Sequence, residues 1–224
     1  MNRKKIILIF FCFFFLFFSS LLFAKSNRNV IRVITLPEAQ RTSPVSIEQS
    51  ILKRRSERTF LKQPLSESQI SQLLWCAQGI TDKEWGLRAA PSAGAVFPLE
   101  LYIVKDDGIY HYVPDGHYME LVNKNNVKSA LAQSTLGQKF VEDAPINIII
   151  ASNHEKGRKK FGSRAERYVY MEAGHAAENI HLQAISLGLG SVPVGAFWDD
   201  IAKKILFLPE DEYPLYIIPI GYTP

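Results

Sequence analysis

The stretch KKFGSRAERYVYMEAGHAAENIHLQAISLGLGSVPVGAF, residues 159–197, decides the fold because it carries the longest helical pattern in the chain. From about 164 to 187 it is small or apolar on most helical faces. We therefore expect a buried helix. The small and apolar positions are Ala173, Gly174, Ala176, Ala177, Ile180, Ala184 and Ile185. Such side chains also let a second helix approach closely, which suits either a domain core or a dimer interface.

Shorter patterns on both sides of this helix predict one domain over residues 44–224, after a polar lead segment at 25–43. Two capping boxes, Ser46 with Gln49 and Ser66 with Gln69, begin helices. Further helices are expected near 127–132 and 199–206. The expected strands are 99–105, 108–113, 117–122, 146–150, 192–194 and 214–221. A long loop at 81–98 and a polar stretch at 152–162 complete an α+β sandwich with a mixed sheet.

The first 24 residues are typical of a secretory signal peptide. They carry a basic start and then an apolar run over residues 6–23. An uncleaved membrane anchor formed by that run is the alternative. We therefore expect an exported, periplasmic or extracytoplasmic protein, either free or anchored by residues 6–23.

The remaining domain is electrically balanced. The chain has 26 Lys and Arg against 22 Asp and Glu, and the four extra cations lie at positions 3–5 and 25. No nucleic-acid partner is expected, because binding to a phosphate backbone needs a net basic surface. Cys76 is the one cysteine after the signal segment, which excludes an intramolecular disulfide. Its apolar helical neighbours predict a buried structural thiol.

A cluster of cations, RRSER at residues 54–58, is the first candidate binding element. Its members are Arg54, Arg55, Ser56 and Arg58. A phosphate monoester favours this composition, because guanidinium groups bind phosphate oxygens bidentately and a hydroxyl completes the shell. The alternative is a solvated helix end whose cations complement the helix dipole.

Two further segments are rich in small residues. The loop APSAGA, residues 90–95, would let a flat ring lie against the backbone, with Gly94 free to adopt positive φ; the alternative is an ordinary surface turn. The turn GLGSVPVGAF, residues 188–197, lacks the strand-then-helix context of a dinucleotide fingerprint. It can aim a backbone amide at a redox centre, or it can be a helix cap that leads into a strand.

The order and flanks of these three segments resemble the SagB/ThcOx-type dehydrogenases of the nitroreductase superfamily. The motifs KRRSERTF, RAAPSAGAVFPLELYIV, LGQKFVEDAPINIII and the stretch 159–197 carry this resemblance over nearly the whole mature chain. It implies a nitroreductase-like three-layer α/β/α sandwich with a mixed, mostly antiparallel sheet. It also implies a homodimer that holds FMN noncovalently at its interface.

The resemblance assigns FMN contacts by motif match. The phosphate and ribityl end would be held by Arg54, Arg55, Ser56 and Arg58. The partner subunit would place beside the ring Pro91, Ser92, Ala93 and Gly94. Gln138 would bring an amide near the ring edge. The turn whose backbone amide approaches flavin N5 would be Pro193, Val194, Gly195 and Ala196, and a donor there favours the reduced flavin.

The reaction itself stays open. The expected activity is hydride transfer through flavin N5 to or from a small molecule or peptide, with NAD(P)H as one candidate donor and no side chain assigned as catalytic. Azoline-oxidising members carry a Lys-Tyr pair where this chain has Lys160-Phe161, so a phenol acid/base partner is missing. The alternative function is an exported flavin-binding or scaffold protein of the same fold without turnover.

No metal site is expected. His175 and His181 are six residues apart on the long helix, so their side chains face different directions and do not form a zinc pair.

Overall fold

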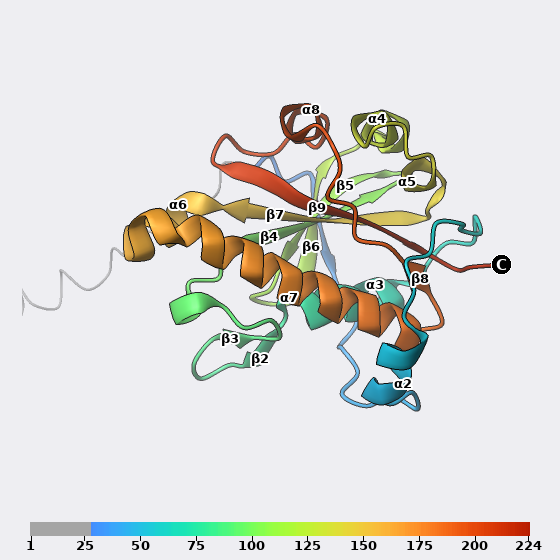
Figure 1. The fold of residues 1–224 in the computed structure, drawn as a ribbon, viewed down its shortest axis with the longest axis horizontal. Coiled ribbons are helices and arrows are strands. Elements are labelled where there is room, and N and C mark those ends of the chain that lie inside the picture. Colours follow the sequence, from blue (N-terminus) through green and yellow to red (C-terminus); the bar gives the residue numbers. More distant parts are fainter. Residues whose placement is uncertain (1–27) are drawn as a thin grey trace, which may run out of the picture.

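The structure is a computed structural model that describes residues 28–224, so the signal segment predicted at 1–24 lies outside the described residues. A seven-stranded sheet in the order β1-β6-β5-β4-β7-β9-β8 forms its centre (Figure 1). Its strands are β1 (Arg32–Thr35), β4 (Leu99–Lys105), β5 (Gly108–Val113), β6 (Tyr118–Asn123), β7 (Ile146–Asn153), β8 (Gly190–Ser191) and β9 (Glu212–Gly221). All neighbouring strands of this sheet pair antiparallel, and a parallel bridge joins Ser56 to Ser191.

Helices cover both faces of the sheet (Figure 1). One face carries α2 (Ile47–Lys53), α3 (Glu67–Gln78) and α7 (Ala165–Ser186), and the other carries α4 (Lys128–Ser134), α5 (Phe140–Asp143) and α8 (Asp199–Ile205). Successive residues of a strand point to opposite faces. Leu101 and Ile103 accordingly join the core under α3 and α7, whereas Tyr102 and Val104 join the core under α4 and α8. The predicted α+β sandwich is confirmed.

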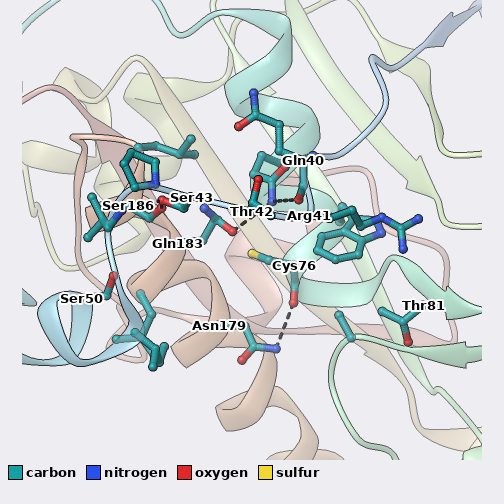
Figure 2. Close-up of a pocket in the computed structure, with 18 residues that line it drawn as sticks. Gln40, Arg41, Thr42, Ser43, Ser50, Cys76, Thr81, Asn179, Gln183 and Ser186 are labelled. Carbon is teal, nitrogen blue, oxygen red and sulfur yellow. Dashed lines mark hydrogen bonds between the residues drawn. The ribbon is translucent and has the colours of Figure 1, made fainter.

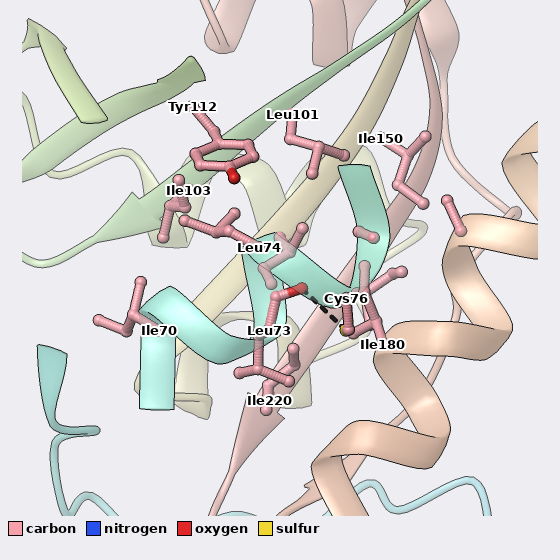
Figure 3. Packing of buried hydrophobic residues seen from close by; sticks show 14 of the residues in the cluster. Ile70, Leu73, Leu74, Cys76, Leu101, Ile103, Tyr112, Ile150, Ile180 and Ile220 are labelled. Atoms are coloured by element: carbon pink, nitrogen blue, oxygen red, sulfur yellow. Dashed lines mark hydrogen bonds between the residues drawn. The ribbon is translucent and has the colours of Figure 1, made fainter. Parts of the chain in front are cut away.

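The helix α3 forms as its capping box predicts. The Ser66 side chain accepts the Gln69 amide at 3.2 Å, and the Gln69 side chain accepts the Ser66 amide at 2.9 Å. Leu73 and Leu74 then pack against the sheet (Figure 3). Cys76 lies in the same cluster, where its Sγ donates to the Leu73 carbonyl oxygen at 3.1 Å. Burial raises the pKa of this thiol, which confirms the predicted structural cysteine.

Within a single chain the long helix α7 is buried on one side only, so the domain core accounts for one side of the expected buried helix and the expectation of a dimer interface stays a prediction. Ala176 and Ile180 are fully buried against the sheet. On the opposite side Tyr170 is 52% exposed and Met171 is 48% exposed. The sheet and α3 cover one side of α7, and within residues 28–224 no element covers the side that carries Tyr170 and Met171. No helix within residues 28–224 is long and apolar enough to cross a membrane.

Several segments differ from the predicted elements. The polar stretch 152–162 forms the end of β7 and the helix α6 (His154–Phe161), which begins with the Asn153 side chain accepting the Lys156 amide. The expected loop at 81–98 contains a small hairpin, β2 (Ile80–Asp82) with β3 (Leu87–Arg88), and the short 3-10 turn η1 (Ala93–Ala95). The strand expected at 192–194 is displaced to β8. The predicted lead segment contains β1, which pairs with β6 at the sheet edge.

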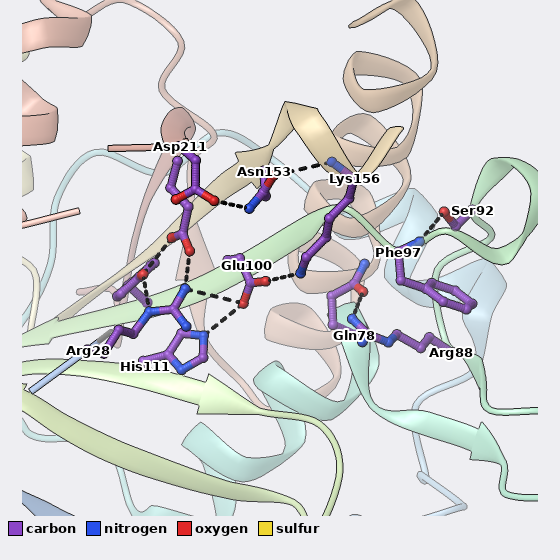
Figure 4. Close-up of polar contacts among 12 residues, drawn as sticks. Arg28, Gln78, Arg88, Ser92, Phe97, Glu100, His111, Asn153, Lys156 and Asp211 are labelled. Carbon is purple, nitrogen blue, oxygen red and sulfur yellow. Dashed lines mark hydrogen bonds and ion pairs between the residues drawn. The ribbon is translucent and has the colours of Figure 1, made fainter. Parts of the chain in front are cut away.

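A buried polar cluster ties the first described residue to the sheet (Figure 4). Arg28 Nε donates to the Tyr102 hydroxyl at 2.8 Å, and that hydroxyl donates to Glu212 at 2.6 Å. The Glu100 carboxylate forms hydrogen bonds with His111 Nε2, at 2.9 Å, and with Lys156 Nζ. Burial alone would raise the pKa of Glu100, but its bond with His111 and the charges of Lys156 and Arg28 outweigh burial and lower it to about 2. The segment before β1 is therefore held by charge pairing as well as by strand pairing.

Glu172 is a buried acid on the inner side of α7. Its side chain is 2% exposed, and its Oε1 has no hydrogen-bond partner within the described part of the chain. Burial raises the pKa of Glu172 to about 7, although Ser92, Arg88 and Gln78 act in the opposite direction. The native state thus keeps this proton to about pH 7, whereas the unfolded chain loses it near the ordinary value of 4.5.

Glu172→Gln is therefore expected to stabilise the protein in a pH-dependent way. The free energy of unfolding of the wild type falls as pH rises from the unfolded to the folded pKa, and a glutamine removes that loss. At about pH 8 the variant should gain roughly 1–3 kcal/mol over the wild type, and at about pH 5 much less. Thermal melts followed by circular dichroism measure this difference. The solvent-exposed Glu166→Gln on the same helix is the control, and an equal gain for Glu172→Gln at both pH values would contradict the assignment.

Candidate functional site

The arginine cluster begins where α2 ends. Arg54 is the C-cap residue of α2, and its side chain is 33% exposed. Its Nη1 lies 3.0 Å from His181 Nε2, and its Nε lies 4.0 Å from Glu178 Oε1. Both partners belong to the last turns of α7. The guanidinium group is thereby held at the junction of α2 and α7.

The other two arginines differ from each other in what they contact. Arg55 Nη1 donates to the carbonyl oxygens of Leu52, at 3.1 Å, and Arg54, at 2.7 Å. Arg58 instead donates to the Ser56 carbonyl oxygen at 3.3 Å, with its Cζ 5.9 Å from the centre of the Phe140 ring. Arg55 therefore satisfies carbonyl groups at the end of α2, as the helix-end interpretation predicts, whereas Arg54 and Arg58 point away from the helix end.

Strand β8 joins the arginine cluster to the glycine-rich turn. Ser56 bridges Ser191, and the Glu57 amide donates to the Ser191 carbonyl oxygen at 3.0 Å. The backbones come so close here that a Cβ at Gly190 would lie 2.8 Å from the Glu57 Cβ. Only glycine fits such an approach. Residues 54–58 and 190–196, far apart in the sequence, are thus neighbours in the fold.

The turn at 193–196 leaves some backbone amides free. Val194 exchanges two backbone hydrogen bonds with Ile217, at 2.8 and 3.0 Å, so its amide is already used. Gly195 and Ala196 are exposed, and within residues 28–224 their amides donate to no protein acceptor. Gln138 lies beside them, with its Nε2 donating to the carbonyl oxygens of Ala196, at 3.2 Å, and Thr135, at 2.8 Å. The structure therefore brings Gln138 to the turn and, within the described residues, leaves two backbone amides and the side-chain Oε1 of Gln138 without a hydrogen-bond partner.

The PSAGA loop, residues 91–95, lies near the start of α7. Gly94 has φ of +56°, and its carbonyl oxygen accepts a hydrogen bond from Lys160 Nζ at 2.8 Å. The Ser92 hydroxyl accepts the Phe97 amide at 2.9 Å. The neighbouring Phe161 packs edge-on against Tyr168 near the start of α7, with ring centres 5.1 Å apart. The Lys160-Phe161 pair therefore supports this loop.

One chain does not bring all the predicted site residues together. From Tyr168 to His181 the helix rises roughly 20 Å. This distance separates Pro91, Ser92, Ala93 and Gly94 from the arginine cluster. The 193–196 turn lies between the two, because Gly195 lines a hollow together with Tyr170, near the start of α7. Within a single chain the predicted residues thus do not form one compact site. Residues 91–94 lie near the start of α7, the arginine cluster lies near its end, and the segment from β8 to the 193–196 turn extends from His181 toward Tyr170.

A hollow of about 420 Å³ adjoins the turn. Gly195 and Phe197 line it together with the rings of His154, Tyr170 and Tyr213. Its volume lies within the range of small-molecule sites. A second hollow, of about 540 Å³, lies between the segment before α2, α3 and the end of α7, and none of the predicted site residues line it (Figure 2).

Sequence reasoning missed two residues of the site, His181 and Ser191. His181 is 127 residues from Arg54 in the chain, so no local spacing links them. The sequence did predict that His175 and His181 face different directions, and the structure confirms it, because His175 is exposed and His181 is buried. No group of three or more potential metal ligands occurs in the described part of the chain.

Comparison with known proteins identifies the family. The sequence profile of the Nitroreductase family matches residues 51–222. A Methanocaldococcus jannaschii protein assigned as a nitroreductase is 42% identical over 194 residues, covering 84% of this chain and 95% of that protein. A crystal structure of a Ralstonia eutropha protein assigned as a nitroreductase superposes with a TM-score of 0.79 at 34% identity, covering 86% of this chain and 90% of that one.

A more distant structure shares the fold. It is the NADPH:FMN oxidoreductase from Vibrio harveyi complexed with NAD+, with a TM-score of 0.60 at 20% identity over 79% of this chain and 68% of that one. The match over most of the chain, together with the sandwich fold, shows that the chain belongs to the nitroreductase family of oxidoreductases.

Proposed function

We propose that this chain is an FMN-dependent oxidoreductase of the SagB type, which transfers hydride through flavin N5 to or from a small molecule or peptide. The observation that carries the proposal is the pairing of Ser56 with Ser191. It places the arginine cluster beside β8, and β8 leads directly into the turn with the free amides of Gly195 and Ala196. This arrangement offers phosphate-binding donors at one end and unoccupied backbone donors at the other.

The residues present fit FMN at its phosphate end. A guanidinium group has five N–H donors, so Arg54 and Arg58 keep several after their contacts with His181 and the Ser56 carbonyl oxygen. A phosphate monoester is best held by such charge-assisted, bidentate bonds. The Ser56 hydroxyl is exposed beside them and can complete the shell. Arg55 would then contribute charge rather than direct bonds.

The turn fits the redox end of the same cofactor. Bound FMN supplies hydride transfer at N5, and the protein supplies binding, orientation and electrostatics. The Gly195 amide would donate toward N5, because the Val194 amide is committed to Ile217. A hydrogen-bond donor that is already in place near N5 stabilises the electron density that reduction adds to the flavin, and the protein does not have to rearrange. The free side-chain Oε1 of Gln138 can accept a hydrogen bond from the ring edge.

We further propose a homodimer in which the exposed side of α7 meets its copy. A two-fold axis across this side would run the helices antiparallel, because an isologous interface pairs the same surface of both subunits. The start of one helix would then lie near the end of the other. The PSAGA loop of the partner subunit would thereby reach the arginine cluster and the turn. Gly174 has open space above it, which permits such an approach.

The same geometry bears on the substrate and on the place of action. The Phe161 ring lies against Gly94 of the PSAGA loop and has no phenol, so we do not assign azoline oxidation to this chain. Residues 1–24 favour export, with anchorage by residues 6–23 as the alternative. An exported enzyme must find FMN and an electron donor outside the cytoplasm, and NAD(P)H is one candidate donor.

Arg54→Ala combined with Arg58→Ala is expected to abolish FMN binding while the oligomeric state stays unchanged. Each charge-assisted bond contributes about 1.5–3 kcal/mol, so the Kd should rise at least about 100-fold. Quenching of flavin fluorescence measures the Kd. The exposed Lys53→Ala, one residue before the cluster, controls for a general loss of positive charge. Full retention of FMN by the double variant would refute the phosphate site.

The visible spectrum separates an enzyme from a flavin-binding or scaffold protein. The purified protein, mixed with FMN and then separated from unbound FMN by gel filtration, should be yellow, should bleach with dithionite and should recover its colour when an acceptor is added. Bleaching by dithionite but not by NADH would indicate another donor. A protein that stays colourless after FMN addition would contradict the enzyme proposal, and bleaching without recovery by any acceptor would favour the scaffold alternative.

Met171→Arg is expected to dissociate the dimer and to weaken FMN binding at the same time. A charge in the middle of the proposed helix pair cannot be solvated, and the PSAGA loop of the partner would be lost. Light scattering after size-exclusion chromatography gives the mass. Ile201→Arg is the matched control, since Ile201 is 49% exposed on α8 across the sheet. A Met171→Arg protein that remains dimeric with full FMN affinity would exclude this interface.

A further inference from the structure

His181 is a buried polar side chain next to the arginine cluster. It lies near the end of α7 and is 2% exposed. Its Nε2 lies 3.0 Å from Arg54 Nη1, and its Nδ1 lies 2.5 Å from the Ser191 hydroxyl. The imidazole therefore spans the space between the C-cap of α2 and strand β8.

The chemistry of these two contacts selects one protonation state. A guanidinium group only donates, so Nε2 must carry a lone pair. Nδ1 then carries the hydrogen and donates to Ser191, which is the neutral Nδ1–H tautomer. Burial, and next the charge of Arg54, lower the pKa of His181 to about 4, which keeps the ring neutral at ordinary pH.

We propose that His181 is a positioning residue that holds the Arg54 guanidinium toward the phosphate of the cofactor. The inference rests on the proposed FMN site and assigns a role to a residue that does not itself touch the cofactor. The Arg54 Nη1 donor is held by His181 and Nε lies 4.0 Å from Glu178 Oε1, whereas the remaining guanidinium donors have no hydrogen-bond acceptor within residues 28–224. Ser191 fixes the ring in turn, so the chain of contacts runs from β8 through His181 to Arg54.

The charges around His181 explain why Arg54 needs this support. Glu178 stands one turn earlier on α7, with Oε1 4.0 Å from Arg54 Nε. Glu57 lies against Gly190, next to Ser191. If His181 were removed, the Glu178 carboxylate would compete with the phosphate for the guanidinium group. A neutral acceptor at 181 thus holds Arg54 without neutralising the charge that the phosphate needs.

The test compares two substitutions at the same position by titration with FMN and with riboflavin, which lacks the phosphate. His181→Leu removes the acceptor and should raise the Kd for FMN about 10-fold, as expected for loss of support to a charged hydrogen-bonding group. His181→Gln keeps an acceptor oxygen and should stay within about 3-fold of the wild type. Neither substitution should change the riboflavin Kd.

Two further variants separate positioning from folding. In an Arg54→Ala background, His181→Leu should change the FMN Kd no further, because the residue through which it acts is gone. Ser191→Ala leaves the size of the core almost intact and should raise the FMN Kd by about 3-fold. Parallel losses for riboflavin, or an undiminished effect in the Arg54→Ala background, would overturn the assignment. A wild type that binds no FMN would instead overturn the proposed function.

Discussion

The packing of α7 against the central sheet is the constraint on which the rest of the structure depends. Alanines form most of its inner side, and Ala176 and Ala184 are fully buried. Their small size lets the helix lie close over the isoleucine-rich strands β7 and β9. Both halves of the candidate site are attached to this helix, the PSAGA loop near its start and Arg54, through His181, near its end. The helix therefore sets the spacing of the site.

Elements with a strong local signal could be predicted from the sequence. The strands β4 and β5 have the predicted bounds, because both are rich in apolar residues, the Asp107-Gly108 turn separates them and the Asp115-Gly116 turn follows β5. The helix α3 begins at its capping box for the same reason. Elements that depend on distant partners could not be predicted in this way. Strand β1 is recognisable only by its pairing with β6, and the polar helix α6 has no apolar stripe to reveal it.

The candidate site also combines features that local sequence predicts with features that depend on distant parts of the chain. The residue types in RRSER and PSAGA are enough to indicate binding, but local sequence does not show which donors are free. Arg55 is occupied by the end of its own helix, and the Val194 amide is occupied by Ile217. His181 and Ser191 join the site only through long-range packing. The exposed side of α7 differs most from what the sequence pattern indicates for a single chain. A helix that is apolar on most faces can be covered by its own domain or by a second subunit, and the local pattern does not distinguish the two.

The central claim is that the arginine cluster and the 193–196 turn hold the two ends of one flavin. A crystal structure of the protein with FMN tests it most directly. The account predicts the phosphate on Arg54 and Arg58, the Gly195 amide facing N5, and residues 91–94 of a second subunit beside the ring. A flavin bound elsewhere, or one whose phosphate does not contact Arg54 and Arg58, would contradict the account.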